Sequence, residues 1–187
     1  MTQTALYTLE QFGLDVRRTL NLWGNSKSGV LCLGPLMQRL AKEGGPLHEM
    51  GEHAALSSGL PGRRLYKAED SSFLLLWAQY PADTPTAIHS HEGWVVICLL
   101  EGSERYTSWR RSDDGSDPSH MDLAVAQEHT ILPGEVGYLF NAPFNIHRQW
   151  PGPQGAKELV LMGGRGLRLH HIDEATGECT PPPDVGR

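Results

Sequence analysis

The sequence has few of the features that mark secreted, membrane-spanning or nucleic-acid-binding proteins. Only three of its 187 residues are cysteines, Cys32, Cys98 and Cys179, and an odd, sparse set does not form a disulfide framework. No apolar run approaches the ~18 residues that a membrane helix needs. The N-terminus has no basic segment followed by an apolar one, as a signal peptide would. These absences predict a cytoplasmic protein with no membrane partner.

The chain also has no long basic run and a modest excess of negative charge. Its 16 Lys and Arg residues stand against 22 Asp and Glu residues, for a net charge of -6. Nucleic acid is therefore not an expected partner. A small molecule that enters a pocket responds to local charge instead, so a small-molecule substrate remains open. No interface signature is visible in the sequence, which leaves a homodimer as an untested alternative.

Turn-forming residues are abundant, and they favour a β-rich domain. The chain contains 21 glycines and 13 prolines, which is more typical of many short strands than of a helical bundle. Its length suits one core, because single β-barrel domains run to roughly 250 residues. We therefore predict a single domain over 1–187, with a helical cover at 1–50, a barrel at 62–175 and an extended tail at 176–187.

The N-terminal fifty residues show the periodicity of amphipathic helices. Apolar residues recur every three or four positions in LEQFGLDVRRTLNLW, which predicts a helix. Thr8 precedes this run and Gln11 follows three residues later, a pattern typical of a capping box. Gly24 and Asn25 then end the helix, and GPLMQRLAKEGG predicts a second one. The two helices are interpreted as a cover for one face of the barrel.

Beyond residue 62 the chain alternates between strand-length apolar segments and clusters of Gly, Pro, Asp and Asn. Within this region His89 and His91 form an H-x-H pair on a predicted strand. Strand side chains alternate, so residues i and i+2 point to the same face and can bind one ion together. His147, after a Pro-Gly turn and another strand, is the expected third ligand. The six remaining histidines are interpreted as surface or edge residues: His48, His53, His120, His129, His170 and His171.

Two segments resemble the paired motifs of the cupins. TPTAIHSHEGWVVICLLEG is similar to the first cupin motif and ILPGEVGYLFNAPFNIHRQW to the second. This resemblance implies a mainly β fold, the cupin double-stranded β-helix or jelly-roll barrel, with two or three N-terminal helices. The glutamate of the first motif would fall near Val95 or Val96, and Glu92 is turned to the opposite face. The predicted site therefore consists of three neutral imidazoles that leave up to three positions on a divalent ion free.

Residues 63–178 also resemble the bacterial thiol dioxygenases, the group that contains cysteine dioxygenase and 3-mercaptopropionate dioxygenase. The resemblance is carried by RRLY, TAIHSHEGWVV, LLEGSERYTSWRRSDDG, LPGEV with NIHR, and MGGRG with IDEATGE. It implies one iron(II) ion on His89, His91 and His147, O₂ as co-substrate, and oxidation of a thiol to a sulfinic acid. It also implies that Arg63, 26 residues before His89, binds the carboxylate of a mercapto-acid such as cysteine or 3-mercaptopropionate. An arginine fork suits that group.

The chain departs from this family in the surroundings of the metal. The family often carries Ser-x-His-x-Tyr on the strand before the Gly-Gly pair, but these positions are Glu158, Val160 and Met162 here. The cysteine that some members crosslink to their tyrosine would fall at Val96, so no crosslinked cofactor is expected. Such outer changes typically cost 10–100-fold in affinity or activity unless they are compensated.

Two further functions stay open beside thiol oxidation. One is a three-histidine cupin oxygenase of different chemistry, such as carbon–carbon cleavage of a diketone-like chelator. The other is a non-catalytic cupin that binds a metal or a small ligand. Neutral imidazole also suits nickel, manganese and zinc, so the sequence does not identify the ion.

Overall fold

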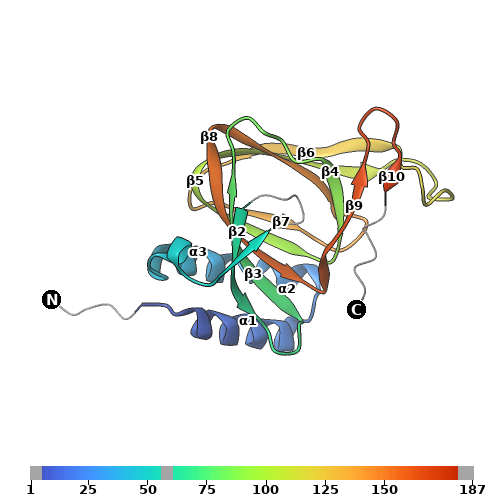
Figure 1. The fold of residues 1–187 in the computed structure, drawn as a ribbon. Helices are drawn as coiled ribbons and strands as arrows, with labels where there is room; N and C mark the ends of the chain where they lie inside the picture. Colours follow the sequence, from blue (N-terminus) through green and yellow to red (C-terminus); the bar gives the residue numbers. More distant parts are fainter. Residues whose placement is uncertain (1–5, 56–60, 181–187) are drawn as a thin grey trace.

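The computed structural model describes residues 6–55 and 61–180 and shows a mainly β protein behind a helical N-terminus (Figure 1). Three α-helices come first, followed by one short 3₁₀ turn: α1 (Leu9–Trp23), α2 (Lys27–Leu31), α3 (Gly34–Glu43) and η1 (Leu47–Glu49). Ten strands follow: β1 (Glu52–Ala55), β2 (Pro61–Lys67), β3 (Phe73–Tyr80), β4 (Ile88–Glu92), β5 (Val95–Arg111), β6 (Leu123–Ile131), β7 (Val136–Leu139), β8 (Ile146–Gly163), β9 (Arg165–Ile172) and β10 (Cys179–Thr180). The predicted fold class is confirmed, and the sheet curls into a half-barrel.

The first helix forms where the sequence predicts it. The Thr8 hydroxyl accepts a hydrogen bond from the backbone N–H of Gln11, and the Gln11 side chain accepts one from the Thr8 N–H. This capping box satisfies two of the donors that the first helical turn leaves unpaired. At the other end, Gly24 adopts a positive φ of 62° and its N–H bonds to the Leu20 carbonyl. Among the residues described, no helix is both long and apolar enough to cross a membrane.

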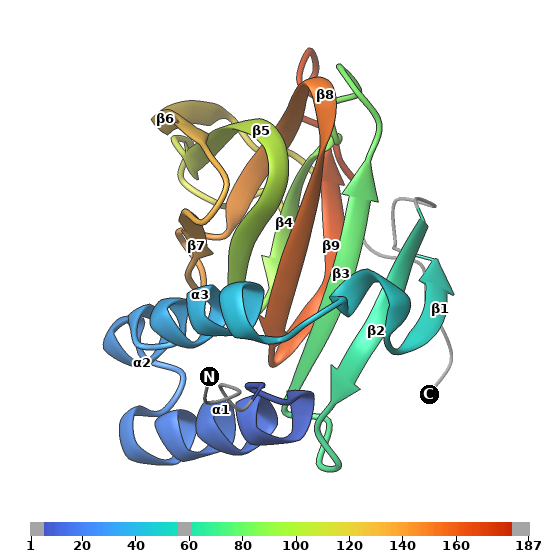
Figure 2. The same ribbon diagram turned by 90° about the vertical axis from the view of Figure 1, so that its left-hand side faces the viewer.

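Two long strands, β5 and β8, tie the two walls of the curled sheet together. They pair with each other in antiparallel fashion from Val95↔Met162 to Trp109↔Ile146. Each also pairs with other strands along its length: β5 with β7 and β6, and β8 with β3 and β4. Figure 2 shows the resulting bend of both strands. Because β8 bonds to β4 near its start, it carries the third histidine to the strand that holds the other two.

Side-chain alternation divides most of the core into two clusters on opposite faces of the sheet, and a third, smaller cluster includes Ile88 and Trp109. One face of β5 and β8 places residues such as Cys98 and Leu161 against the helices. The other face places Ile97 and Val160 inside the curl. The helices lie together below the sheet in Figure 2 and cover the first of these faces. The inner face is thereby left free to line a cavity.

The strands extend beyond the predicted barrel at both ends. β1 begins at Glu52, ten residues before the predicted start at 62, and pairs with β2. β10 lies inside the segment that was predicted to be an extended tail. It pairs with the end of β9, and the Cys179 N–H bonds to the Ser119 carbonyl at 2.7 Å. The Cys179 side chain is buried, which accounts for the added strand. The rest of the predicted tail, 181–187, lies outside the described residues.

Candidate metal centre

Three histidines from two strands converge at one point inside the curl of the sheet. His89 and His91 lie on β4, and His147 lies on β8 directly opposite His89. One potential ligand atom from each ring lies within 4.8 Å of the others. The Nε2 atoms of His91 and His147 are 3.0 Å apart, close to the separation of two adjacent nitrogens that are each ~2.1 Å from a common ion. The three predicted ligands are therefore brought together in a geometry that fits a metal.

The environment of these rings favours the neutral form, which is the form that binds metals. All three are buried. Burial, followed by the neighbouring His91, lowers the pKa of His89 to about 3. Burial and the other two rings also hold the pKa of His147 well below its ordinary value. The cause is that a positive charge is costly where water is excluded and other imidazoles are near.

The three histidines differ in the contacts that hold them in position. Nδ1 of His89 lies 2.9 Å from the Ala87 carbonyl, so a proton on Nδ1 leaves the Nε2 lone pair for an ion. Asn145 fixes the β4 backbone by donating to the His91 carbonyl at 2.7 Å. Nδ1 of His147 is buried and has no hydrogen-bond partner in the described part of the chain. Its ring lies instead beside Tyr106, with ring centroids 5.3 Å apart.

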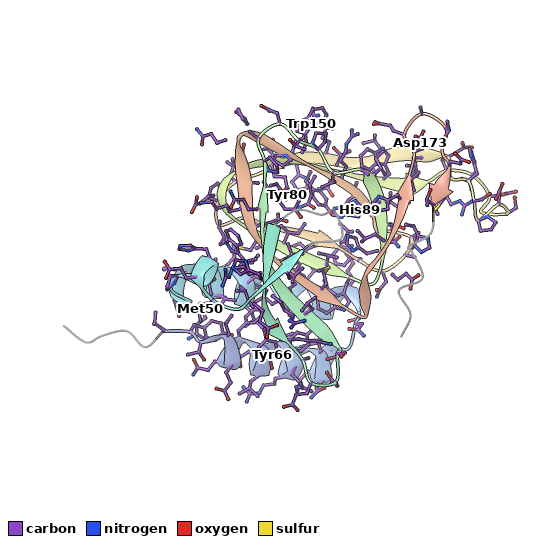
Figure 3. The ribbon with its side chains drawn as sticks, in the orientation of Figure 1. Met50, Tyr66, Tyr80, His89, Trp150 and Asp173 are labelled. Atoms are coloured by element: carbon purple, nitrogen blue, oxygen red, sulfur yellow. The ribbon has the colours of Figure 1, made fainter. Side chains whose placement is uncertain are left out.

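The histidines form part of the wall of a cavity of about 80 Å³. Figure 3 shows Tyr80 and His89 inside the curl of the sheet, from β3 and β4. Most of the wall is apolar, which limits the access of water. The apolar lining consists mainly of Leu76, Val95, Ile97, Val160, Met162 and Leu169. The polar lining beyond the three histidines is Tyr80, Thr86, Gln149 and His171.

The structure does not bring Arg63 to this cavity. Arg63 lies on β2 opposite Trp77, a residue of the helix-facing cluster. Its guanidinium donates to the carbonyl oxygens of Met50 at 2.6 Å and Gly51 at 3.0 Å. A spacing of 26 residues in the sequence does not specify which face of the sheet a strand residue occupies. Carboxylate binding by Arg63 therefore stays a prediction that the observed contacts do not support.

The sequence pattern did not identify all of the polar residues that line the cavity. His171, interpreted as a surface or edge residue, is exposed as expected, and it also pairs with His89 across β4 and β9 and lines the cavity. Its neighbour His170 points the other way and lies 3.2 Å from Glu92, as the alternation of a strand requires. Gln149 was not singled out, although it lies two residues after His147 and so shares its face. Alternation along β8 was the signal that could have identified it.

Position 158, one of the changed relay positions, holds a carboxyl group in an internal polar cluster. Glu158 and Glu104 are both fully buried. The Gln149 amide nitrogen donates to Glu158 at 2.9 Å and to Glu104 at 3.1 Å. Val160 and Met162, the other two changed positions, contribute apolar wall. The site therefore combines three imidazoles, an apolar cavity and a buried acid pair.

Comparisons with known proteins give similarity to solved structures only. No protein-family model matches the chain, and no curated protein matches it. The polyketide cyclase RemF from Streptomyces resistomycificus is 18% identical, with a TM-score of 0.43 over 68% of this chain and 78% of that one. A Cupin 2 conserved barrel domain protein from Salinispora arenicola is 16% identical, with a TM-score of 0.42 over 60% and 82%.

A third similar structure is much longer than the part that matches. The DMSP lyase DddQ from Ruegeria pomeroyi is 16% identical, with a TM-score of 0.38 over 50% of this chain and 39% of that one. The identities and TM-scores of all three are too low to transfer any chemistry. The features of this chain that bear on its function are the three-histidine group, which could hold a metal, and the cavity beside it.

Proposed function

We propose that this protein is a mononuclear non-haem iron(II) dioxygenase that oxidises a small thiol to a sulfinic acid. The observation that carries the proposal is the convergence of three buried imidazoles on the wall of a mostly apolar cavity. The resemblance of residues 63–178 to thiol dioxygenases supports the choice of reaction. When bound, the metal would lower the pKa of a ligated thiol and mediate electron transfer between sulfur and oxygen.

The reaction balances without any further redox partner. R–SH and O₂ give R–SO₂H: the O–O bond breaks, two S–O bonds form, sulfur loses four electrons and oxygen gains them. The thiol proton passes to the medium or to the product. No separate reductant has to bind.

The chain's own residues have separate tasks in this proposal. His89, His91 and His147 would hold the ion. The apolar wall, including Val95 and Met162, excludes water from the bound thiol. Water exclusion strengthens local electrostatic interactions and prevents side reactions.

The test is metal analysis followed by oxygen consumption. Protein purified without added metal should contain iron, and with a thiol it should form one sulfinate per O₂ consumed. His147→Ala should lose the metal and the activity, because two imidazoles alone hold iron weakly. His48→Ala is the matched control, since His48 is exposed and remote from the three ligands in the sequence.

Several results would refute the proposal. Full iron content and turnover in His147→Ala would show that this histidine is not a ligand. Oxygen uptake with a diketone but with no thiol would indicate the carbon–carbon cleavage chemistry. An absence of uptake with every substrate, despite bound iron, would indicate a non-catalytic binding protein.

A further inference from the structure

The polar part of the cavity is backed by a hydrogen-bonded acid pair. Gln149 lines the cavity and donates to both Glu158 and Glu104. Tyr80 also lines the cavity and lies close enough to Glu158 to influence the pKa of that carboxyl. Glu104 and Glu158 are neighbours behind these two residues, and each influences the pKa of the other. Gln149 is thus fixed in place by two carboxyls that water does not reach.

Within the part of the chain that the structure describes, the acid pair has no cationic partner. Neither Glu104 nor Glu158 forms an ion pair with a lysine or arginine in the described ranges. Burial and the neighbouring Glu158 raise the pKa of Glu104 well above its ordinary value, whereas burial raises that of Glu158 to about 7. Both carboxyls therefore hold their protons more tightly than exposed glutamates do, and any negative charge on the pair is buried. A buried charge of this kind is stabilised by a nearby cation.

In the described residues, the same cavity offers a carboxylate no lysine or arginine side chain. Arg63 donates to backbone carbonyls elsewhere. A substrate carboxylate would also be repelled by the negative charge of Glu158. The lack of a lysine or arginine and the charge of Glu158 therefore both disfavour the binding of a mercapto-acid.

The distance between the three histidines and Gln149 suits a short molecule. Gln149 is two residues beyond His147 on the same face of β8, which places it ~7 Å along the strand. A two- or three-carbon thiol with sulfur at the histidines can reach this point with its other end. The Tyr80 hydroxyl oxygen and the Gln149 carbonyl oxygen are acceptors that suit an N–H donor.

We propose that the substrate is a small thiol that bears an ammonium group and no carboxylate. Its sulfur lies at the three histidines, and its ammonium group lies at Tyr80 and Gln149, where the Glu104–Glu158 pair supplies the compensating charge. The identity of the reacting group depends on the proposed function, whereas the preference for a cation depends only on the polar cluster.

The experiment compares three thiols of similar length that differ in charge: 2-aminoethanethiol, 2-mercaptoethanol and 3-mercaptopropionate. With the iron-loaded protein, kcat/KM for oxygen consumption should be at least about tenfold higher for the amine than for the carboxylate. The neutral thiol should fall between them. A higher value for 3-mercaptopropionate would overturn the inference and leave thiol oxidation intact.

A binding measurement separates the inference from the proposed reaction. Cobalt(II)-loaded protein without oxygen reports thiolate ligation through its absorption spectrum. If no thiol supports oxygen uptake, thiol oxidation is refuted. Tighter binding of 2-aminoethanethiol than of 3-mercaptopropionate would then still support the inference, and equal or weaker binding would overturn it.

Removal of the Glu158 carboxyl tests whether this residue sets the preference for an ammonium group. Glu158→Gln should lower the amine-to-carboxylate ratio by about tenfold, with a matching fall in the ratio of cobalt-protein affinities. Glu101→Gln is the matched control, because Glu101 is an exposed glutamate of β5 that pairs with Lys157. A Glu158→Gln ratio equal to that of the wild type would overturn the role of this carboxyl. If this variant does not fold, the wild-type comparison of the three thiols decides.

Discussion

Burial sets the charge of the individual residues at the candidate site, and it acts in opposite directions on bases and acids. It lowers the pKa of His89 to about 3 and raises that of Glu158 to about 7. The same loss of hydration disfavours an imidazolium cation and a carboxylate anion. The imidazoles are therefore ready to bind an ion, while the acid pair retains at least one proton at neutral pH.

The raised pKa of Glu158 predicts a pH-dependent contribution to stability. Between about pH 4.5 and 7 the folded carboxyl keeps a proton that the unfolded one has lost, so folding is disfavoured as pH rises. The stability of the wild type relative to Glu158→Gln should fall by about 3 kcal/mol across this window. Urea unfolding of both proteins at several pH values measures this difference in the free energy of unfolding. A constant difference from pH 4.5 to 7 would contradict the burial argument.

At the scale of secondary-structure elements, the antiparallel pairing of β5 with β8 requires close backbone contact at one point. Gly102 on β5 has a φ of 84°, and a Cβ atom there would lie 2.0 Å from the Gly155 carbonyl oxygen. Register shifts flank this point between Leu99 and Glu101 and between Gly102 and Glu104. The glycine therefore meets two requirements, a left-handed backbone conformation and space for the partner strand.

A pair of glycine substitutions separates these two requirements. Gly134 has a similar φ of 86°, but a Cβ there would have no atom within 4 Å. Gly134→Ala should therefore cost about 1 kcal/mol, from backbone strain alone. Gly102→Ala should cost at least about 3 kcal/mol, because the strands must also separate. Chemical denaturation measures both, and equal losses would show that the close contact is not needed.

At the scale of the whole molecule, the sheet separates a structural core from the cavity. Leu161 and Met162 are neighbours on β8, but Leu161 packs against the helix-facing cluster and Met162 lines the cavity. The helices at the N-terminus complete the core on one side only (Figure 2). Stability and chemistry are thus carried by alternate residues of the same strand.

This division predicts different effects for two adjacent substitutions. Leu161→Ala should lower the free energy of unfolding by about 2–5 kcal/mol, because it leaves a void in a close-packed core. It should leave the metal content unchanged. Met162→Ala should cost less stability, since its side chain already borders a cavity, but should change the KM for a thiol. Calorimetry and steady-state kinetics distinguish the two, and a loss of metal in Leu161→Ala would contradict the separation.

The sequence by itself determined the features that depend on local pattern. Thr8 and Gln11 form the capping box because the two residues are three apart in one helical turn. His89 and His91 share a face because strand side chains alternate. The order of the two histidine motifs was enough to identify His147 as the third member of the cluster.

Only the tertiary structure decided which distant residues meet. Whether Arg63 faces the cavity or the helices depends on strand pairing and on the register shift between Arg64 and Tyr66, and a one-residue change of register reverses every side chain. The contacts of His171 with the cavity and of Glu104 with Glu158 likewise come from separate strands. Alternation is fixed by the covalent chain, but cross-strand register is set by packing of the whole sheet.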